Sequence, residues 1–241
     1  MLGPVFAPSL RLRRGSINKN QFYDTLTYEI MHRSLTATSV CIDVGCHEGS
    51  ILRGMMKLAP NGRFYAFEPL PQLYDKLKVS FPFPEVRLFN LALSNQTGVV
   101  TFNHVISNPG YSGILKRKYD RPEETDCTIS VSADRLDNVI DTGEDVGFIK
   151  IDVEGAELQV LQGAIDTIRR CKPIIVFEHG LGAADCYGTT PDQVYGLLCD
   201  DCGLNISLLD SWLKDRKPLS QVGFREQFEK GMNFMFIAHP I

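Results

Sequence analysis

The sequence predicts an α/β fold in which helices cover both faces of a mostly parallel sheet of about seven strands. Two observations support this prediction. Short runs of β-branched and aromatic residues alternate along the chain with stretches of helical periodicity. The runs are also apolar at successive positions, which is typical of parallel strands buried on both faces, because helical crossovers cover both sides of such a sheet. We therefore expect residues 1–241 to form one doubly wound domain.

The apolar runs place the strands, and the intervening stretches place the helices. Expected strands cover residues 39–46, 63–69, 86–93, 147–155 and 173–180. Expected helices cover residues 18–32, 50–58, 70–79, 155–170 and 191–202. In the helix at 155–170, apolar residues between Ala156 and Ile168 form a broad stripe, and polar residues such as Gln159 occupy the other side. This helix should pack on the sheet.

Two regions depart from the alternation. Residues 98–105 and 128–140 have strand-like patterns and flank a polar insertion, residues 103–127, which we interpret as a surface loop on a local β extension. Near the end of the chain, residues 206–211 and 231–240 are strand-like, and we expect only a loop between them. They predict a final antiparallel pair and thus a C-terminal antiparallel strand.

Composition limits the kinds of partner. The net charge of -4 at pH 7 provides no general attraction for nucleic acid or for anionic membranes. Arg11, Arg13 and Arg14 form a small basic cluster, which we interpret as solvated, within the N-terminal arm and helix of residues 1–37. No apolar run approaches the roughly 20 residues of a membrane span, and the start of the chain lacks the order of a signal peptide. We expect a cytoplasmic protein, and the sequence does not indicate its oligomeric state.

The seven cysteines are expected to be reduced, because an odd number spread among apolar segments is typical of thiols that act as small hydrophobes. Cys199 and Cys202 form a lone CxxC pair. With His179 and Cys186 upstream, this pair suggests a zinc-dependent interaction module as an alternative, although the spacing matches no common zinc finger.

The first expected strand leads into a turn that contains Gly45 and Gly49. In open α/β sheets this turn forms the floor of the ligand site, and glycine lets the backbone approach a ligand closely. The amides at the start of the next helix favour an anionic group. Glu68 ends the next strand, where a carboxylate accepts hydrogen bonds from both hydroxyls of a ribose. The two features together predict a ligand that contains ribose.

Several segments in order resemble the FkbM-type methyltransferases, which are S-adenosylmethionine-dependent O-methyltransferases. The segments are "IDVGCHEGS", "YAFEP", "NLALSNQTGVVTF", "SADRLDNVI", "FIKIDVEGAELQVLQGA" and "IIVFEHG", and they span about residues 40–180. The block "KIDVEGAE" is the most specific of them. The resemblance implies the Rossmann-like class I methyltransferase fold.

The resemblance also implies which residues bind S-adenosyl-L-methionine. Glu68 would hold the ribose. Asp43, Gly45 and the turn residues Cys46, His47, Glu48, Gly49 and Ser50 would hold the methionine part, and Asn90, Leu91 and Ala92 would border the adenine. The turn departs from the Gly-Ala-Asn-Ile-Gly-like pattern that is usual in the family. A carboxylate at Asp43 or Glu48 suits the ligand's ammonium group, and the helix start suits its carboxylate.

The chemistry requires groups at strand ends near this turn. Methyl transfer is an in-line displacement, so the enzyme must align an acceptor hydroxyl and help to remove its proton. Asp152 follows the fourth strand, and Glu178 and His179 follow the fifth, so these side chains should converge. Two mechanisms fit: either His179 is the general base and an acid orients it, or Asp152, Glu178 and His179 bind a divalent metal ion that acidifies the acceptor hydroxyl.

Other polar residues in this region also have ordinary structural explanations. The stem of Lys150 can cover apolar surface, and Glu157 suits the first turn of a helix. Tyr111 and Ser112 lie in a glycine-flanked part of the insertion, which we expect to act as a lid over the acceptor. The resemblance implies a sugar, glycan or natural-product hydroxyl as acceptor.

Two alternative functions remain. A nicotinamide-dependent oxidoreductase shares the fold and the ribose acid, but it requires the G-x-G-x-x-G fingerprint, which this turn lacks. A non-catalytic S-adenosylmethionine-binding protein would keep the cofactor pocket without turnover. The presence of Asp43, Glu68 and Asp152 argues against this second alternative.

Overall fold

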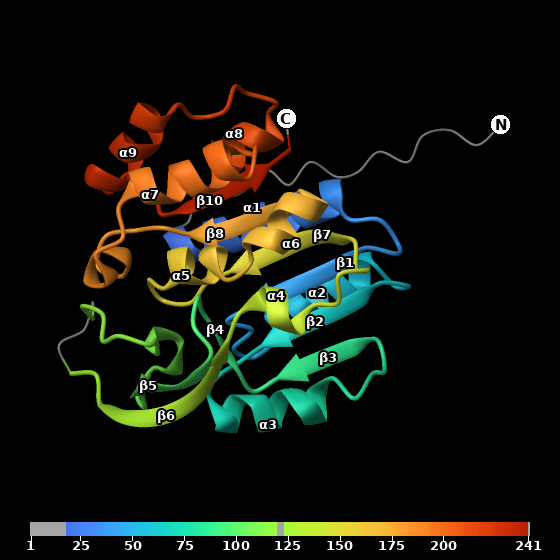
Figure 1. Cartoon of the computed structure of the whole chain (residues 1–241), viewed down its shortest axis with the longest axis vertical. Helices are drawn as coiled ribbons and strands as arrows, with labels where there is room; N and C mark the ends of the chain where they lie inside the picture. Colours follow the sequence, from blue (N-terminus) through green and yellow to red (C-terminus); the bar gives the residue numbers. More distant parts are fainter. Residues whose placement is uncertain (1–17, 120–122, 241) are drawn as a thin grey trace.

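The computed structural model describes residues 18–119 and 123–240, so Arg11, Arg13 and Arg14 lie outside the described residues. A seven-stranded sheet forms the centre, in the order β3-β2-β1-β7-β8-β10-β9 (Figure 1). Its strands are β1 (Val40–Val44), β2 (Arg63–Phe67), β3 (Val86–Phe89), β7 (Val146–Ile151), β8 (Ile174–Glu178), β9 (Asn205–Leu208) and β10 (Met235–His239). The strands from β3 to β8 are parallel, and β10 runs antiparallel to β8 and β9. The predicted fold class and C-terminal antiparallel strand are confirmed.

Helices cover both faces of the sheet, as Figure 1 shows with α5 and α6 in front and α1 and α2 behind. The helices are α1 (Lys19–Ser34), α2 (Ser50–Leu58), α3 (Pro71–Ser80), α4 (Leu136–Val139), α5 (Glu157–Gln162), α6 (Ile165–Cys171), α7 (Pro191–Tyr195), α8 (Leu209–Leu213) and α9 (Gln221–Glu229). Buried residues of α5, α6, α7 and α9 pack on one face. Those of α1, α2 and α8 pack on the other. Each strand directs alternate side chains to the two faces, so its apolar residues are buried on both sides of the sheet.

The helix boundaries have local causes. Asn18 begins α1 with a capping box, in which its side chain accepts from the amide of Gln21 and the Gln21 side chain accepts from the amide of Asn18. The expected helix at 155–170 is interrupted at Gly163, where α5 ends and α6 follows. A Cβ on Gly163 would lie 2.0 Å from the carbonyl oxygen of Ser94, so this close approach requires glycine.

Further expectations about secondary structure are wrong in detail. The expected strand at 86–93 is split between β3 and β4 (Ala92–Leu93), which belong to different sheets. The helix expected at 191–202 is α7 followed by a π-helical turn, Gly196–Asp201. The helices α8 and α9 lie between β9 and β10, where we expected only a loop. Both are short, and their stabilisation comes from packing on the sheet.

The expected β extension is a second sheet of three strands, in the order β4-β6-β5. Its β5 (Gly98–Val105) and β6 (Asp126–Asp134) form an antiparallel pair whose connection is the polar insertion. The chain after β6 forms α4 instead of continuing the strand to residue 140. Two short 3₁₀ turns, η1 (Pro109–Tyr111) and η2 (Ala184–Tyr187), lie in loops near the sheet's carboxyl edge.

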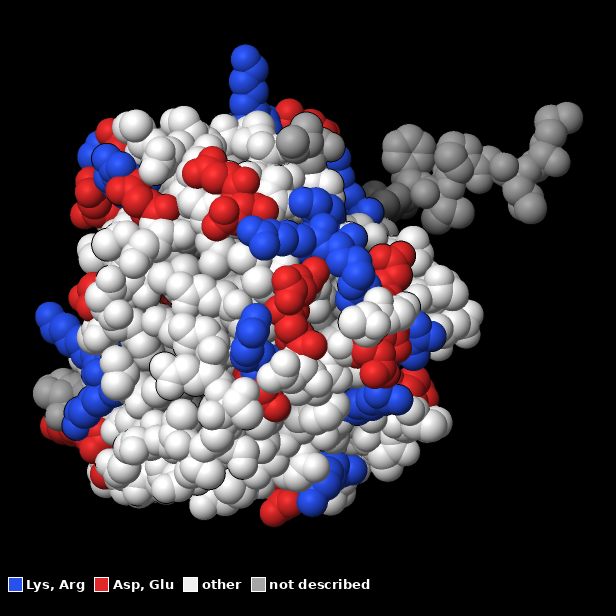
Figure 2. All heavy atoms as spheres, in the orientation of Figure 1, with Lys and Arg blue, Asp and Glu red and all other residues white. Residues whose placement is uncertain are grey.

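All seven cysteines lie in the described ranges and are free. Among the described residues, the one group whose ligand atoms are close enough for a metal ion is Asp152, Glu154 and Glu178, so Cys199 and Cys202 do not form a zinc site with His179 and Cys186. None of the described helices combines the length and hydropathy of a membrane span. Figure 2 shows basic and acidic side chains interspersed on the face that it presents, which is typical of a solvated surface.

Candidate active site

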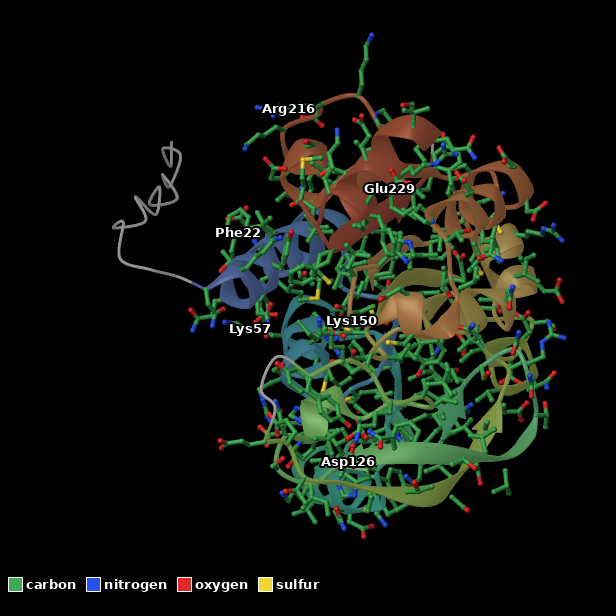
Figure 3. All side chains as sticks on the ribbon, turned by 90° about the vertical axis from the view of Figure 1, so that its left-hand side faces the viewer. Phe22, Lys57, Asp126, Lys150, Arg216 and Glu229 are labelled. Carbon is green, nitrogen blue, oxygen red and sulfur yellow. The ribbon has the colours of Figure 1, made fainter. Side chains whose placement is uncertain are left out.

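Strand geometry gathers charged side chains at the carboxyl edge of the sheet. Side chains alternate between the two faces along a strand, so Lys150 and Asp152 of the β7 segment share the face covered by α1. Asp43 of β1 is paired in register with Lys150, and Glu178 ends the neighbouring β8. This position adjoins the point where strand order reverses between β1 and β7, where open α/β sheets bind ligands. Figure 3 shows Lys150 in the interior, whereas Phe22 of α1 lies at the periphery.

The turn after β1 is fixed by backbone contacts. The amides of Gly45 and Cys46 both donate to the carbonyl oxygen of Phe67, at 3.1 and 3.0 Å. Gly45 has a φ of 76°, and a Cβ on it would lie 1.9 Å from the carbonyl oxygen of Asp152. Glycine is therefore required there for both conformation and space. His47 has a φ of 51°, and its amide donates to Glu68 Oε2 at 2.8 Å.

A cavity of about 270 Å³ lies over this turn. Predicted cofactor residues that line it are Asp43, Gly45, Cys46, His47, Ser50, Glu68, Leu91 and Ala92. Three others lie elsewhere. Glu48 is exposed outside the cavity lining, and Gly49 is buried beneath the turn against Phe81. Asn90 supports the cavity indirectly, because its side-chain amide donates to the carbonyl oxygens of Glu68 and Pro69, both at 2.9 Å.

Glu68 is a fixed acceptor at one end of this cavity. Its Oε1 accepts from the amide of Leu70 at 3.0 Å, in addition to the bond from His47 to Oε2. Burial raises the pKa of Glu68 to about 7, and the two amides only partly oppose that rise. Each carboxylate oxygen keeps a lone pair for a hydroxyl donor.

Asp43 is buried and lines the same cavity. Neither carboxylate oxygen meets the geometry of a hydrogen bond with a described residue, although the Cys46 thiol and the Leu52 amide lie near enough to lower its pKa slightly. Burial raises the pKa of Asp43, and the ammonium group of Lys150 acts in the opposite direction. A buried carboxylate without a partner is costly unless a ligand supplies donors. Asp43 therefore fits an ammonium or hydroxyl group of a bound molecule.

A second cavity, about 460 Å³, adjoins the first. Asp24, Ile51, Lys150, Asp152 and Glu154 line both cavities, so they mark the junction between two ligand sites. The predicted lid residues are divided between them. Tyr111 lines the second cavity, whereas Ser112 lines the first instead of the acceptor side.

Ion pairs organise the junction. Lys150 Nζ lies 2.9 Å from Asp152 Oδ2, and Arg117, from the insertion, pairs with Glu154. Burial alone would raise the pKa of Asp152, but Lys150 outweighs it and the pKa is lowered. Burial and the charge of Asp152 raise the pKa of Glu154 to about 8 despite Arg117. The pKa of Glu178 is raised well above its usual value by burial and by its acidic neighbours, and its side chain hydrogen-bonds Asp152.

His179 does not join this cluster, so the expected convergence is confirmed for Asp152 and Glu178 and is wrong for His179. It follows Glu178 directly, and adjacent strand residues point to opposite faces of a sheet. The imidazole stacks on Phe224 and Phe228 of α9, with ring centroids 5.6 and 4.5 Å away. Neither ring nitrogen has a hydrogen-bond partner among the described residues, and burial lowers the pKa of His179 to about 4.

The expected metal site of Asp152, Glu178 and His179 is therefore not assembled. A different trio, Asp152, Glu154 and Glu178, has ligand atoms within 4.8 Å of one another. Two of its carboxylates already pair with Lys150 and Arg117. A divalent ion there would lie close to two fixed cations, so the donor set fits such an ion poorly.

Sequence reasoning missed residues contributed by the surrounding segments. Asp24 belongs to α1, and Arg117 lies within the charge run of the insertion, so both patterns resembled ordinary solvated surface. A signal for α1 existed: Asn20, Tyr23, Asp24 and Thr27 follow helical spacing and line the second cavity together. The ordinary explanation for Lys150, a stem that covers apolar surface, missed its ion pair with Asp152.

Comparisons with known proteins identify the family of the chain. Residues 43–204 match the family model described as the Methyltransferase FkbM domain. The 2-O-methyltransferase NoeI of Sinorhizobium fredii is 29% identical over 147 residues, which cover 55% of this chain and 60% of that protein. The methyltransferase sdnD of Sordaria araneosa is 26% identical over 160 residues, which cover 54% of this chain and 62% of that protein. The chain thus spans about three fifths of the length of these two relatives.

One solved structure supports the fold. The methyltransferase FkbM from Methylobacillus flagellatus superimposes with a TM-score of 0.53 at 16% sequence identity, covering 85% of this chain and 44% of that one. At this identity the likeness concerns the fold alone.

Proposed function

Because the chain belongs to the FkbM methyltransferase family, we propose that it is an S-adenosylmethionine-dependent O-methyltransferase that acts on a hydroxyl of a sugar, glycan or natural product. The observation that carries this proposal is the pair of adjoining cavities, which share a junction lined by Asp24, Lys150, Asp152 and Glu154. A methyl donor in the first cavity and an acceptor in the second would meet at this junction. We further propose that the chain acts as a single domain in the cytoplasm.

The first cavity suits S-adenosylmethionine, which supplies an electrophilic methyl group when bound. Glu68 would accept hydrogen bonds from the ribose hydroxyls, and the unpartnered carboxylate of Asp43 would receive the donors it lacks. Leu91 and Ala92 provide apolar surface for the adenine. The backbone turn from Gly45 to Ser50 would hold the methionine part.

The second cavity suits an uncharged, hydroxylated acceptor. Its polar lining includes Asn20, Thr27 and Asn233 beside the acidic cluster, and both of its cations are already paired with carboxylates. An anionic acceptor would meet uncompensated negative charge there. The similarity to a 2-O-methyltransferase supports a hydroxyl as the methylated group.

We propose that Asp152 orients the acceptor hydroxyl, because Lys150 and Glu178 fix its carboxylate at the junction. The insertion, residues 103–127, would close over both ligands, since Ser112 and Tyr111 line different cavities. Residues 120–122 of this lid lie outside the described residues. A metal ion has no role in this scheme.

Methyl transfer from labelled S-adenosylmethionine tests the proposal. The acceptors would be methyl glycosides of neutral hexoses, oligosaccharides and polyketide-type alcohols, each with and without EDTA. We expect turnover with a neutral hydroxylated compound and no loss in EDTA. A protein that binds S-adenosylmethionine but methylates none of these compounds would instead support a non-catalytic binding protein.

A further inference from the structure

Methyl transfer to a hydroxyl requires a group that takes the hydroxyl proton, and the structure points the imidazole of His179 away from the junction. Three carboxylates line both cavities and are therefore placed to meet a reacting hydroxyl: Asp24, Asp152 and Glu154. Their surroundings differ in a way that separates their roles.

Asp152 and Glu154 are each held by a fixed cation. Lys150 lies 2.9 Å from Asp152, and Arg117 pairs with Glu154. Each ion pair engages a carboxylate oxygen and holds the side chain in a fixed orientation, which suits positioning of a ligand more than transfer of its proton. Asp24 has no hydrogen bond or ion pair with any described residue, so both of its oxygens are available to a ligand.

The position of Asp24 is set by contacts on either side of it along α1. The hydroxyl of Tyr23 donates to Asn233 Oδ1 at 2.8 Å, which joins the helix to the segment before β10. One turn later, the hydroxyl of Tyr28 donates to the carbonyl oxygen of Ser50 at 2.9 Å, which joins it to the start of α2. Gly54 allows this approach, because a Cβ there would lie 2.4 Å from the Tyr28 ring.

We propose that Asp24 is the catalytic base, and that its carboxylate accepts the proton of the acceptor hydroxyl. In this step the acceptor oxygen forms a bond to the methyl carbon, the bond from that carbon to sulfur breaks, and its electron pair stays on sulfur. The hydroxyl proton passes to an Oδ of Asp24. Because Asp24 is exposed to solvent, water then removes the proton.

The electrostatic surroundings agree with this role. Partial burial of the carboxyl raises the pKa of Asp24 above its usual value, the ammonium of Lys150 opposes the rise, and the charge of Asp152 adds to it. A raised pKa makes a carboxylate a better base, and Asp24 differs from Glu154 in that no ion pair engages its oxygens among the described residues. Asp24 also precedes the part of the chain that matches the family model, residues 43–204, so α1 would add the base to a site built by that domain.

This inference rests on the proposed function, and its test separates the two. The variants are Asp24→Asn, Asp24→Glu and the matched control Glu29→Gln, which removes a negative charge from an exposed position of α1 outside both cavity linings. For each, calorimetry measures the affinity for S-adenosylhomocysteine, and then the affinity of that complex for the best acceptor of the panel above. Steady-state kinetics measures kcat.

We expect Asp24→Asn to keep both affinities and to lose about 100-fold or more in kcat, which is the usual contribution of a general base. Asp24→Glu should recover part of that loss, and Glu29→Gln should match the wild type. An Asp24→Asn variant with the kcat of Glu29→Gln would overturn the role of Asp24 alone. A wild type that binds S-adenosylhomocysteine but methylates no acceptor would overturn the proposed function, and this role with it.

Discussion

The carbonyl oxygen of Asp152 occupies the space into which a side chain at Gly45 would project, since a Cβ there would lie 1.9 Å from that oxygen. The first turn and the end of β7 are thus in direct backbone contact. One residue helps to form the floor of the first cavity, and the other contributes to the junction. Any shift at Gly45 should therefore displace the charged cluster.

Gly45→Ala tests this contact. We expect the variant to lose S-adenosylmethionine binding and to unfold at lower temperature, because the new Cβ clashes with backbone that has no freedom to move. The matched control is Gly188→Ala, which has a similar φ of 64° but nothing within 4 Å of the added Cβ. That control should show only the backbone cost of about 1–2 kcal/mol. Equal losses in the two variants, by calorimetry and thermal melting, would show that the contact with Asp152 has no effect.

Replacing His179 by phenylalanine should leave turnover unchanged and should maintain or increase stability. The imidazole is buried among phenylalanine rings without a hydrogen-bond partner among the described residues. A buried, unsatisfied polar group destabilises a protein by about 1–3 kcal/mol, and an apolar ring removes that penalty. Asp152→Asn, on the opposite face, should lose turnover while the protein stays folded. If His179→Phe abolishes methyl transfer but keeps cofactor binding, the imidazole has a catalytic role that this geometry does not provide.

The site residues show what a sequence pattern can and cannot predict. Glu68 was predicted from its place at the end of a strand, and Asp43 from the resemblance to the FkbM-type methyltransferases. His179 was misplaced because we grouped it with Glu178 by its nearness along the chain. Adjacent strand residues point to opposite faces of the sheet, so His179 lies on the face opposite Glu178. Asp24 was missed because α1 lies outside the resembling segments, and only the folded chain shows what this helix covers.

The fold, like the site, contains elements that the sequence could locate and elements that depend on tertiary contacts. Strands whose residues are mostly apolar, such as β1, could be located from sequence. By contrast, β3 and β4 could not be separated, because the chain changes sheets at Asn90, whose contacts with the carbonyl oxygens of Glu68 and Pro69 exist only in the folded chain. The short helices α8 and α9 depend on tertiary packing, which no local pattern reports.

Arg117→Gln tests whether the insertion holds the acceptor. The guanidinium pairs with Glu154 and lies 4.9 Å from the Tyr111 ring, and Arg117 lines only the second cavity. We expect the KM for the acceptor to rise about tenfold, equivalent to about 1.4 kcal/mol, with little change in S-adenosylmethionine affinity. The control is Lys116→Gln, which removes the neighbouring exposed pair with Asp126. Parallel losses of acceptor and cofactor affinity in Arg117→Gln would contradict a role in acceptor binding.

Glu157→Gln should change how stability depends on pH. Glu157 Oε1 accepts from the amides of Val153 and Gly155 at 3.0 and 3.1 Å, and burial raises its pKa to about 7 from the ordinary 4.5. A raised pKa in the folded state means that its contribution is present below pH 4.5 and is lost as the pH rises through about 7. The loss is about 1.4 kcal/mol for each unit of pKa difference.

Glutamine keeps an acceptor oxygen and does not titrate. The free energy of unfolding of Glu157→Gln should therefore fall less than that of the wild type between pH 5 and pH 8.5. Denaturant unfolding at the two pH values measures the difference. Identical pH dependence in the two proteins would mean that Glu157 is not buried as a proton-binding group.

The most direct test of the account is calorimetric titration of S-adenosylmethionine into the wild type, Glu68→Gln and Glu48→Gln at pH 6 and pH 8, with NAD as a control ligand. Glu48 lies in the same turn but is exposed outside the cavity lining, so Glu48→Gln makes the same chemical change without touching the site. We predict micromolar binding by the wild type and by Glu48→Gln, and this binding should be stronger at pH 8 because Glu68 ionises with a pKa of about 7. We predict weak, pH-insensitive binding by Glu68→Gln and no binding of NAD. A folded wild type that does not bind S-adenosylmethionine, or a Glu68→Gln variant that binds it as the wild type does, would contradict the assignment of the first cavity.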